Sequence, residues 1–302
     1  HQMASENKTH QAFQQWSQTL KKRLNISVDL RSLGDLLSLQ EQKNSLMYYD
    51  LFHGHQVLWG DSSLLARIKQ PPPVDSETAL RLLVYWGGKL LNLGQEDEQN
   101  PIELWYRSAR AIGDACLIAR HSYHISLQER AQRYHQWQMK YGRKWVRELG
   151  YLYQEALQYH IQPSDFNRHG KLILKRHEKL LELFIKAYLY ILETHLQKPT
   201  SFESLDQIFW SHSPSDSSLK SQFRSVLDNF KFFRGKNFHS NWYSRPLIDR
   251  LYYLLPYLLL HEKKPARETL HWLCPGLSTE ASWQEMNDYF FKIWYQLAPR
   301  MI

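Results

Sequence analysis

The feature of this chain that most restricts its fold is a succession of helix start signals, each followed by an amphipathic stretch. One predicted helix starts at residues 75–76 and ends near Gly94; the next starts where Asn100 precedes Pro101 and Glu103. An N-cap side chain accepts a hydrogen bond from the first helical turn, and proline fits the first helical position because an N–H there has no partner within the helix. These signals predict where the helices begin.

Signals of the same kind continue along the chain. We predict helices from Ser126 toward Gly142, over residues 145–161 and 171–197, and from Ser282 onward. Their apolar side chains recur every three or four positions, as expected of helices that bury one face. Only 12 glycines and 12 prolines occur among the 302 residues. The chain is therefore predicted to be mainly α-helical.

Two short segments near the N-terminus depart from the helical pattern. In residues 26–31 the apolar Ile26, Val28 and Leu30 alternate with polar residues, which is the period of a half-buried strand. A second short strand is predicted over residues 56–59, after a helix. We therefore expect an α+β fold, predominantly α, in which a partial αβ subdomain precedes a helical bundle.

Three consecutive prolines, Pro71 to Pro73, mark a linker, because they continue neither a helix nor an interior strand. We place the αβ subdomain at residues 1–70 and the helical bundle at 74–200. A C-terminal helical region, residues 201–302, is expected to pack on the bundle. The hydrophobic content of 43% is enough for one small and one larger core.

The net charge of the chain and the length of its apolar runs indicate which partners and which cellular compartment to expect. The formal net charge of +8 favours anionic partners such as nucleotides, RNA or acidic proteins. The longest apolar run, residues 251–260, has about half the length that spans a bilayer, and the N-terminus has no hydrophobic signal segment. Cys116 and Cys274 lie far apart and have no companions at metal-ligand spacing. We expect a cytoplasmic protein with no membrane partner.

Four blocks occur in a particular order along the first half of the chain. They are Val28-Asp29-Leu30, residues 49–60, residues 110–115 and residues 123–130. In order and spacing they resemble the nucleotidyltransferase superfamily with a DNA polymerase β-like fold, in the group where a helical domain follows. The resemblance covers roughly residues 10–135.

The resemblance implies Mg²⁺-dependent transfer of a nucleoside monophosphate from an NTP to a hydroxyl of a small molecule, an RNA or a protein. Asp29 would be the catalytic carboxylate and the metal ligand, helping to remove the proton of the acceptor hydroxyl. The family's Gly-Ser turn and Asp-x-Asp pair should precede the first helix, where only a short polar segment stands. Either the chain is a fragment or the domain has lost its metal site, since Mg²⁺ is held by several oxygen ligands.

Two alternatives to the transferase stay open. In one, the chain is a non-catalytic helical interaction or nucleic-acid-binding module. In the other, it is a metal-independent ribonuclease, because Arg234 and His239 have the Arg-x4-His spacing of small helical ribonucleases. Histidine there moves a proton and arginine stabilises phosphate. Arg130 and His135 show the same spacing inside a predicted helix.

Other candidate residues have simpler structural interpretations. We favour a polar turn at His53 and His55, and His121 and His124 lack a third ligand for zinc. Cys116 falls on an apolar helical stripe and is predicted to be a core residue. The other residues of this stripe are Trp105, Ala109, Ile112 and Ala119.

Two acids, Glu103 and Asp114, follow the linker, and one of them would face an acceptor hydroxyl if their helix packed on a nucleotidyltransferase sheet. We favour the structural alternative for both. Glu103 belongs to a helix start, and Asp114 lies one position beside the apolar stripe.

Overall fold

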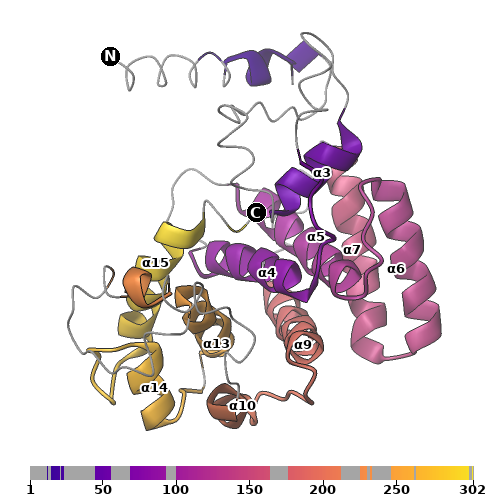
Figure 1. The fold of residues 1–302 in the computed structure, drawn as a ribbon. Helices are drawn as coiled ribbons and strands as arrows, with labels where there is room; N and C mark the ends of the chain where they lie inside the picture. The colour runs from indigo at the N-terminus through magenta and orange to yellow at the C-terminus, as the bar shows by residue number, and fades with distance from the viewer. Residues whose placement is uncertain are drawn as a thin grey trace.

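The computed structural model describes residues 12, 15–20, 22–23, 45–55, 69–92, 100–163, 176–211, 225–229, 232, 246–261, 263–298 and 301. Within these ranges every regular element is a helix (Figure 1). The main ones are α3 (Leu46–Gly54), α4 (Ser76–Leu91), α5 (Pro101–Ala119), α6 (Leu127–Tyr141), α7 (Lys144–Ile161), α9 (His177–Leu196), α10 (Leu205–Ser211), α13 (Leu247–Leu260), α14 (Arg267–Leu273) and α15 (Trp283–Leu297).

The predicted helix starts are confirmed by the caps that the side chains make. Asp75 accepts a hydrogen bond from the backbone of Thr78 at the start of α4, and Asn100 caps α5. Ser126 and Ser282 cap α6 and α15 in the same way. Each cap satisfies an N–H group that would otherwise lack a partner, so these starts depend on residues within one helical turn.

Helix α5 forms the centre of the fold and packs against α4, α7 and α9. The stripe predicted for this helix is buried throughout: Trp105, Ala109, Ile112, Cys116 and Ala119 are all in the core. The small side chains on this stripe let neighbouring helices approach closely, as close packing of a protein interior requires. Cys116 is thus a core residue, as its position on the stripe predicted.

The C-terminal helices join the same core. Helix α13 packs against α4, α9 and α15, and one continuous set of buried residues extends from Leu46 to Met301. Pro256 lies inside α13 and is itself buried. The predicted boundary between residues 200 and 201 is not tested by these contacts and stays a prediction.

The expected α+β architecture is wrong for the described chain, which contains no strand. Both predicted strands, residues 26–31 and 56–59, lie outside the described residues, as does Asp29. Alternation over four to six residues specifies a strand only where a neighbouring strand can pair with its backbone, and the described ranges supply helices instead. Asp50, in one of the blocks behind the resemblance, lies on α3 and accepts hydrogen bonds from Tyr123 before α6.

Within the described ranges, no helix is both long and apolar enough to cross a membrane. The apolar run at residues 251–260 belongs to α13. Its side chains fill the space between α4, α9 and α15, which accounts for its composition.

Candidate functional site

The residues predicted to carry chemistry are only partly within the described chain. Asp29, Arg234 and His239 lie outside it, so Mg²⁺-dependent transfer from an NTP and ribonuclease action both stay untested predictions. His55 lies just after α3, and its Nδ1 lies 3.0 Å and 3.1 Å from two carbonyl oxygens of that helix. No group of three or more His, Cys, Asp or Glu within the described ranges could hold a metal ion.

Asp114, which the sequence offered as a possible reactive acid, is buried in the structure. Its carboxylate lies in the interior, where it accepts hydrogen bonds from Tyr153 Oη at 2.5 Å and Arg130 Nη1 at 3.0 Å. Glu103, in contrast, lies near the surface and pairs with Arg107 at 2.5 Å. A buried carboxylate that accepts from a guanidinium and a hydroxyl fixes the elements that carry its partners, so Asp114 joins α5 to α6 and α7.

Arg130 connects this anchor to the loop before α6. Its Nε donates to the carbonyl oxygen of His124 at 2.5 Å, its Nη2 donates to that of Ile125 at 3.0 Å, and its guanidinium stacks on Tyr123 at 4.4 Å. The Arg-x4-His spacing of Arg130 and His135 does not form a shared site, because Arg130 is buried and His135 is exposed. Arg130 is therefore a structural residue.

Asp50 attaches α3 to the same network. Tyr123 Oη donates to both carboxylate oxygens at 3.0 Å, and Arg130 Nη2 lies 3.9 Å from Oδ2. Burial raises the pKa of Asp50 to about 6, although the neighbouring Arg130 acts in the opposite direction. The network of Asp50, Arg130, Asp114, Tyr123 and Tyr153 thus holds α3, α5, α6 and α7 in a defined arrangement.

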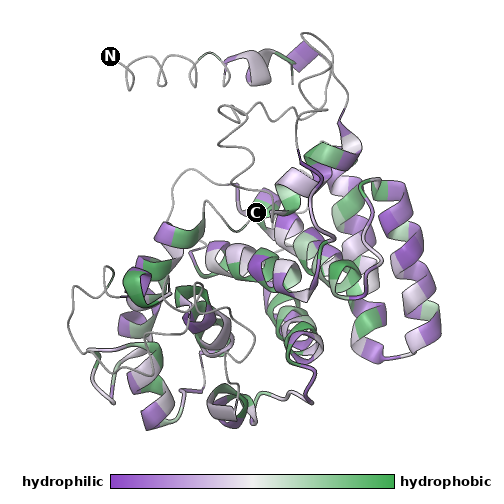
Figure 2. Ribbon diagram, in the orientation of Figure 1, coloured by the Kyte–Doolittle hydropathy of each residue, from purple (hydrophilic) through white to green (hydrophobic). Residues whose placement is uncertain are grey.

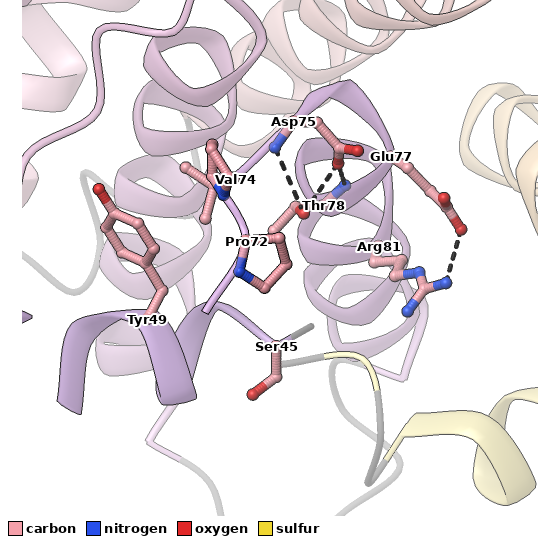
Figure 3. A pocket seen from close by; sticks show the side chains of 9 residues that line it. Ser45, Tyr49, Pro72, Val74, Asp75, Glu77, Thr78 and Arg81 are labelled. Atoms are coloured by element: carbon pink, nitrogen blue, oxygen red, sulfur yellow. Dashed lines mark hydrogen bonds and ion pairs between the residues drawn. The ribbon is translucent and has the colours of Figure 1, made fainter. Parts of the chain in front are cut away.

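A cavity of about 310 Å³ lies between α3 and the start of α4 (Figure 3). Its charged side chains already have partners close by: Asp75 accepts from Thr78 Oγ1 at 2.9 Å, and Arg81 pairs with Glu77 at 2.5 Å. These interactions stabilise the first turns of α4. The charges that line this cavity therefore serve the helix itself.

Helices α6 and α7 form a hairpin at the edge of the molecule opposite α14 and α15 (Figure 1). Gly142 ends α6 with φ +65°, a conformation that glycine adopts without strain, and α7 begins two residues later. Along the inner side of the hairpin, Tyr134 contacts Tyr153 and donates to the carbonyl oxygen of Val146. Hydrophilic residues follow the outer side of α6 (Figure 2).

The turn of this hairpin lies in an unusually basic part of the sequence. Residues 130–147 contain six lysines and arginines and no aspartate or glutamate. The structure separates these cations into two groups. Arg130 and Arg133 face the loop before α6, where Arg133 donates to two carbonyl oxygens. Lys140, Arg143 and Arg147 are exposed around the turn, next to Lys144.

The acids that flank the hairpin are neutralised by other cations. Glu129 pairs with Arg133, and Glu155 pairs with Arg176. Glu148 pairs with Lys179 at 2.7 Å, a hydrogen bond that lowers the pKa of Glu148, and lies 3.8 Å from Lys144. No acid of the described chain forms an ion pair with Lys140, Arg143 or Arg147. The outer surface of the turn is therefore positive without internal compensation.

Large apolar side chains are exposed on the same hairpin. Among described residues, eight large hydrophobic side chains are exposed, and four of these lie on the hairpin, three within or near its turn and one at the far end of α7. They are Met139, Tyr141, Tyr151 and Ile161.

Tyr141 is held in place by cations and rings. The guanidinium groups of Arg143 and Arg120 lie 5.4 Å and 5.5 Å from its ring centre, and Trp137 lies 5.9 Å away. Cation–π contacts of this kind favour a fixed ring orientation. Tyr141 as a whole residue is still 40% exposed.

We call the exposed residues of the hairpin turn and of the adjoining α7 face the basic-aromatic surface; it comprises Met139, Lys140, Tyr141, Arg143, Lys144, Arg147 and Tyr151. A search for runs of basic residues misses it, because only Arg143 and Lys144 are adjacent and the other cations stand three positions away. The signal in the sequence is the absence of acids over residues 130–147, together with interleaved Tyr, Trp and Met.

Comparison with protein-family models, with curated proteins and with solved structures finds no significant match to this chain. The described chain also contains no strand. The resemblance to the nucleotidyltransferase superfamily is therefore wrong. Asp50 and Asp114, two acids from the blocks that carried it, belong instead to the network that joins four helices.

Proposed function

We propose that the chain binds nucleic acid through the basic-aromatic surface of the α6–α7 hairpin. The observation that carries the proposal is that Lys140, Arg143 and Arg147 are exposed together, with no described acid paired to them. Phosphate groups are bound by such cations because the interaction releases condensed counterions from the nucleic acid. Polar and aromatic side chains between the cations are typical of nucleic-acid interfaces.

The arrangement of the hairpin supports this proposal. The helices are tied at the inner side by Tyr134 and Tyr153 and anchored through Asp114. A surface on rigid elements loses little conformational entropy when a ligand binds. On the outer face of α7, Tyr151, Gln154 and Gln158 follow Arg147 as exposed residues. Glu148 and Glu155 flank this face and are paired with Lys179 and Arg176. The face thus offers hydrogen-bonding groups, and the acids beside it are compensated by cations.

The test is titration of a fluorescent oligonucleotide, RNA or DNA, with the protein while anisotropy is recorded at several salt concentrations. We compare the wild type with the triple variant Lys140→Gln, Arg143→Gln, Arg147→Gln. Loss of three phosphate contacts should reduce the slope of log K against log salt by about two to three. Arg143 precedes α7 without making a side-chain cap, so its replacement leaves the helix start intact.

A matched control removes three positive charges from other parts of the molecule. Lys186, Lys263 and Lys292 are exposed, and the first two pair with acids. The variant with all three changed to Gln has the same net charge as the hairpin variant, and should bind with the slope of the wild type. Equal losses in both variants, or wild-type binding without any salt dependence, would overturn the proposal.

A further inference from the structure

From the exposed tyrosines of the basic-aromatic surface we infer that it takes single-stranded nucleic acid, with bases stacked on Tyr141 and Tyr151. This inference rests on the proposed function and goes further by naming the class of ligand. Single strands expose the faces of their bases, whereas in a duplex these faces are covered by neighbouring base pairs. A surface that combines phosphate-binding cations with exposed rings fits the former.

The two rings stand beside cations. The guanidinium groups of Arg143 and Arg120 lie 5.4 Å and 5.5 Å from the centre of the Tyr141 ring, and 40% of the residue's surface stays exposed. Tyr151 is exposed over 69% of its surface and lies one helical turn beyond Arg147, on the same face of α7. A strand whose phosphates contact Arg143 and Arg147 therefore has an aromatic ring within reach of the neighbouring base at each position.

The geometry of the hairpin argues against duplex recognition. Motifs that place a helix in the major groove join two helices at a large angle, so that the second helix projects from the fold. Here α6 and α7 run antiparallel and pack along their lengths: Tyr134 lies beside Tyr153, while Gln138 approaches Gly150. Neither helix projects, and the exposed surface is the outer side of a closely packed pair.

Met139 adds a third apolar contact at the turn, and 72% of its surface is exposed. An unbranched thioether adapts its shape to a base and makes favourable contacts with aromatic rings. Met139 and Tyr141 flank Lys140, so an apolar side chain stands on each side of this cation in the sequence. Cations together with rings and apolar side chains are the groups that bind the phosphates and the bases of a single strand.

The experiment compares the binding of three labelled ligands: a single strand, the matched duplex, and an abasic single strand of the same length. The wild type is expected to bind the complete single strand more tightly than either of the others at equal salt. Tyr151→Ala or Tyr141→Ala should weaken its binding by about five- to a hundredfold, because each removes one stacked base. The salt slope should not change, since no phosphate contact is lost.

Conservative variants separate stacking from folding. Tyr141→Phe and Tyr151→Phe keep the ring and should bind nearly as well as the wild type. Tyr295→Ala removes a tyrosine that is exposed over 55% of its surface on α15, and should leave binding unchanged. Circular dichroism melting of every variant checks that the helices persist.

The outcomes distinguish this inference from the proposed function. If the hairpin cations are needed but single strand and duplex bind equally, or the alanine variants bind like the wild type, the stacking inference is wrong while nucleic-acid binding stands. If the cation variant retains the affinity and salt slope of the wild type, the proposed function itself fails. Equal binding of the strand without bases would also contradict stacking.

Discussion

Replacing Arg130 should be among the most destabilising single changes in this chain. Its guanidinium is buried and donates to the carboxylate of Asp114 and to the carbonyl oxygens of His124 and Ile125. Arg130→Met keeps much of the volume but removes all of these donors. Asp114 then stays buried with Tyr153 as its hydrogen-bond donor and Arg110 no closer than 3.9 Å.

Breaking a buried ion pair by removing one partner costs about 3–5 kcal/mol, because the other charge is left without compensation. We expect Arg130→Met to lower the free energy of unfolding by this amount. Asp114→Asn should also destabilise, since it leaves the arginine without its closest carboxylate. In the double variant neither charge is present, so its loss should fall short of the sum of the single losses by about 1–3 kcal/mol.

Urea denaturation followed by circular dichroism measures these free energies for the four proteins of the cycle. The control is Arg107→Met, on helix α5, where the ion pair with Glu103 is much more exposed. A surface pair contributes at most about 1 kcal/mol, so this variant should unfold near the wild-type midpoint. Additive losses in the double variant, or equal effects of Arg130→Met and Arg107→Met, would refute the reasoning.

Three further predictions concern single sites. Burial raises the pKa of Asp50 to about 6, so the native state binds more protons than the unfolded chain between about pH 4 and pH 6, and the free energy of unfolding should fall as pH rises through this window. Asp50→Asn should flatten that part of a pH series of urea titrations, and an unchanged slope would contradict the assignment. Gly113→Ala places a Cβ 2.1 Å from the ring of Tyr153. The buried ring must shift, so the free energy of unfolding should fall by about 1–3 kcal/mol. A melting temperature equal to that of the wild type would show that the ring moves freely. Burial raises the pKa of the Cys116 and Cys274 thiols, so neither should react with a thiol reagent until urea unfolds the chain, and rapid labelling of the native protein would disprove this.

Local signals in the sequence predicted most of the helices. Asp75, Asn100, Ser126 and Ser282 begin helices as expected, because an N-cap acts on backbone groups within three residues of itself. The buried stripe of α5 was predictable for a similar reason, since the helical period alone brings its residues to one face. Helix ends and core faces are properties of short windows of sequence.

The described chain contains no sheet, and the two segments predicted as strands lie outside it. A strand is harder to predict than a helix because it is not a local property. Alternation in residues 26–31 shows which side chains share a face, but strand formation depends on a partner elsewhere in the chain. Asp50 illustrates the same limit. Its sequence context suggested a segment that closes an αβ domain, whereas the structure uses it to attach α3 to Tyr123 and Arg130.

For the basic-aromatic surface, some properties follow from the sequence and others only from the tertiary structure. The sequence by itself determined that residues 130–147 carry six cations and no acid, and that a glycine separates two helices there. Only the tertiary structure decided which cations face solvent: Arg130 and Arg133 turn toward the loop before α6, while Lys140, Arg143 and Arg147 stay outside. The physical reason is that charge and helix period are set by neighbouring residues, whereas burial is set by helices that meet from distant parts of the chain.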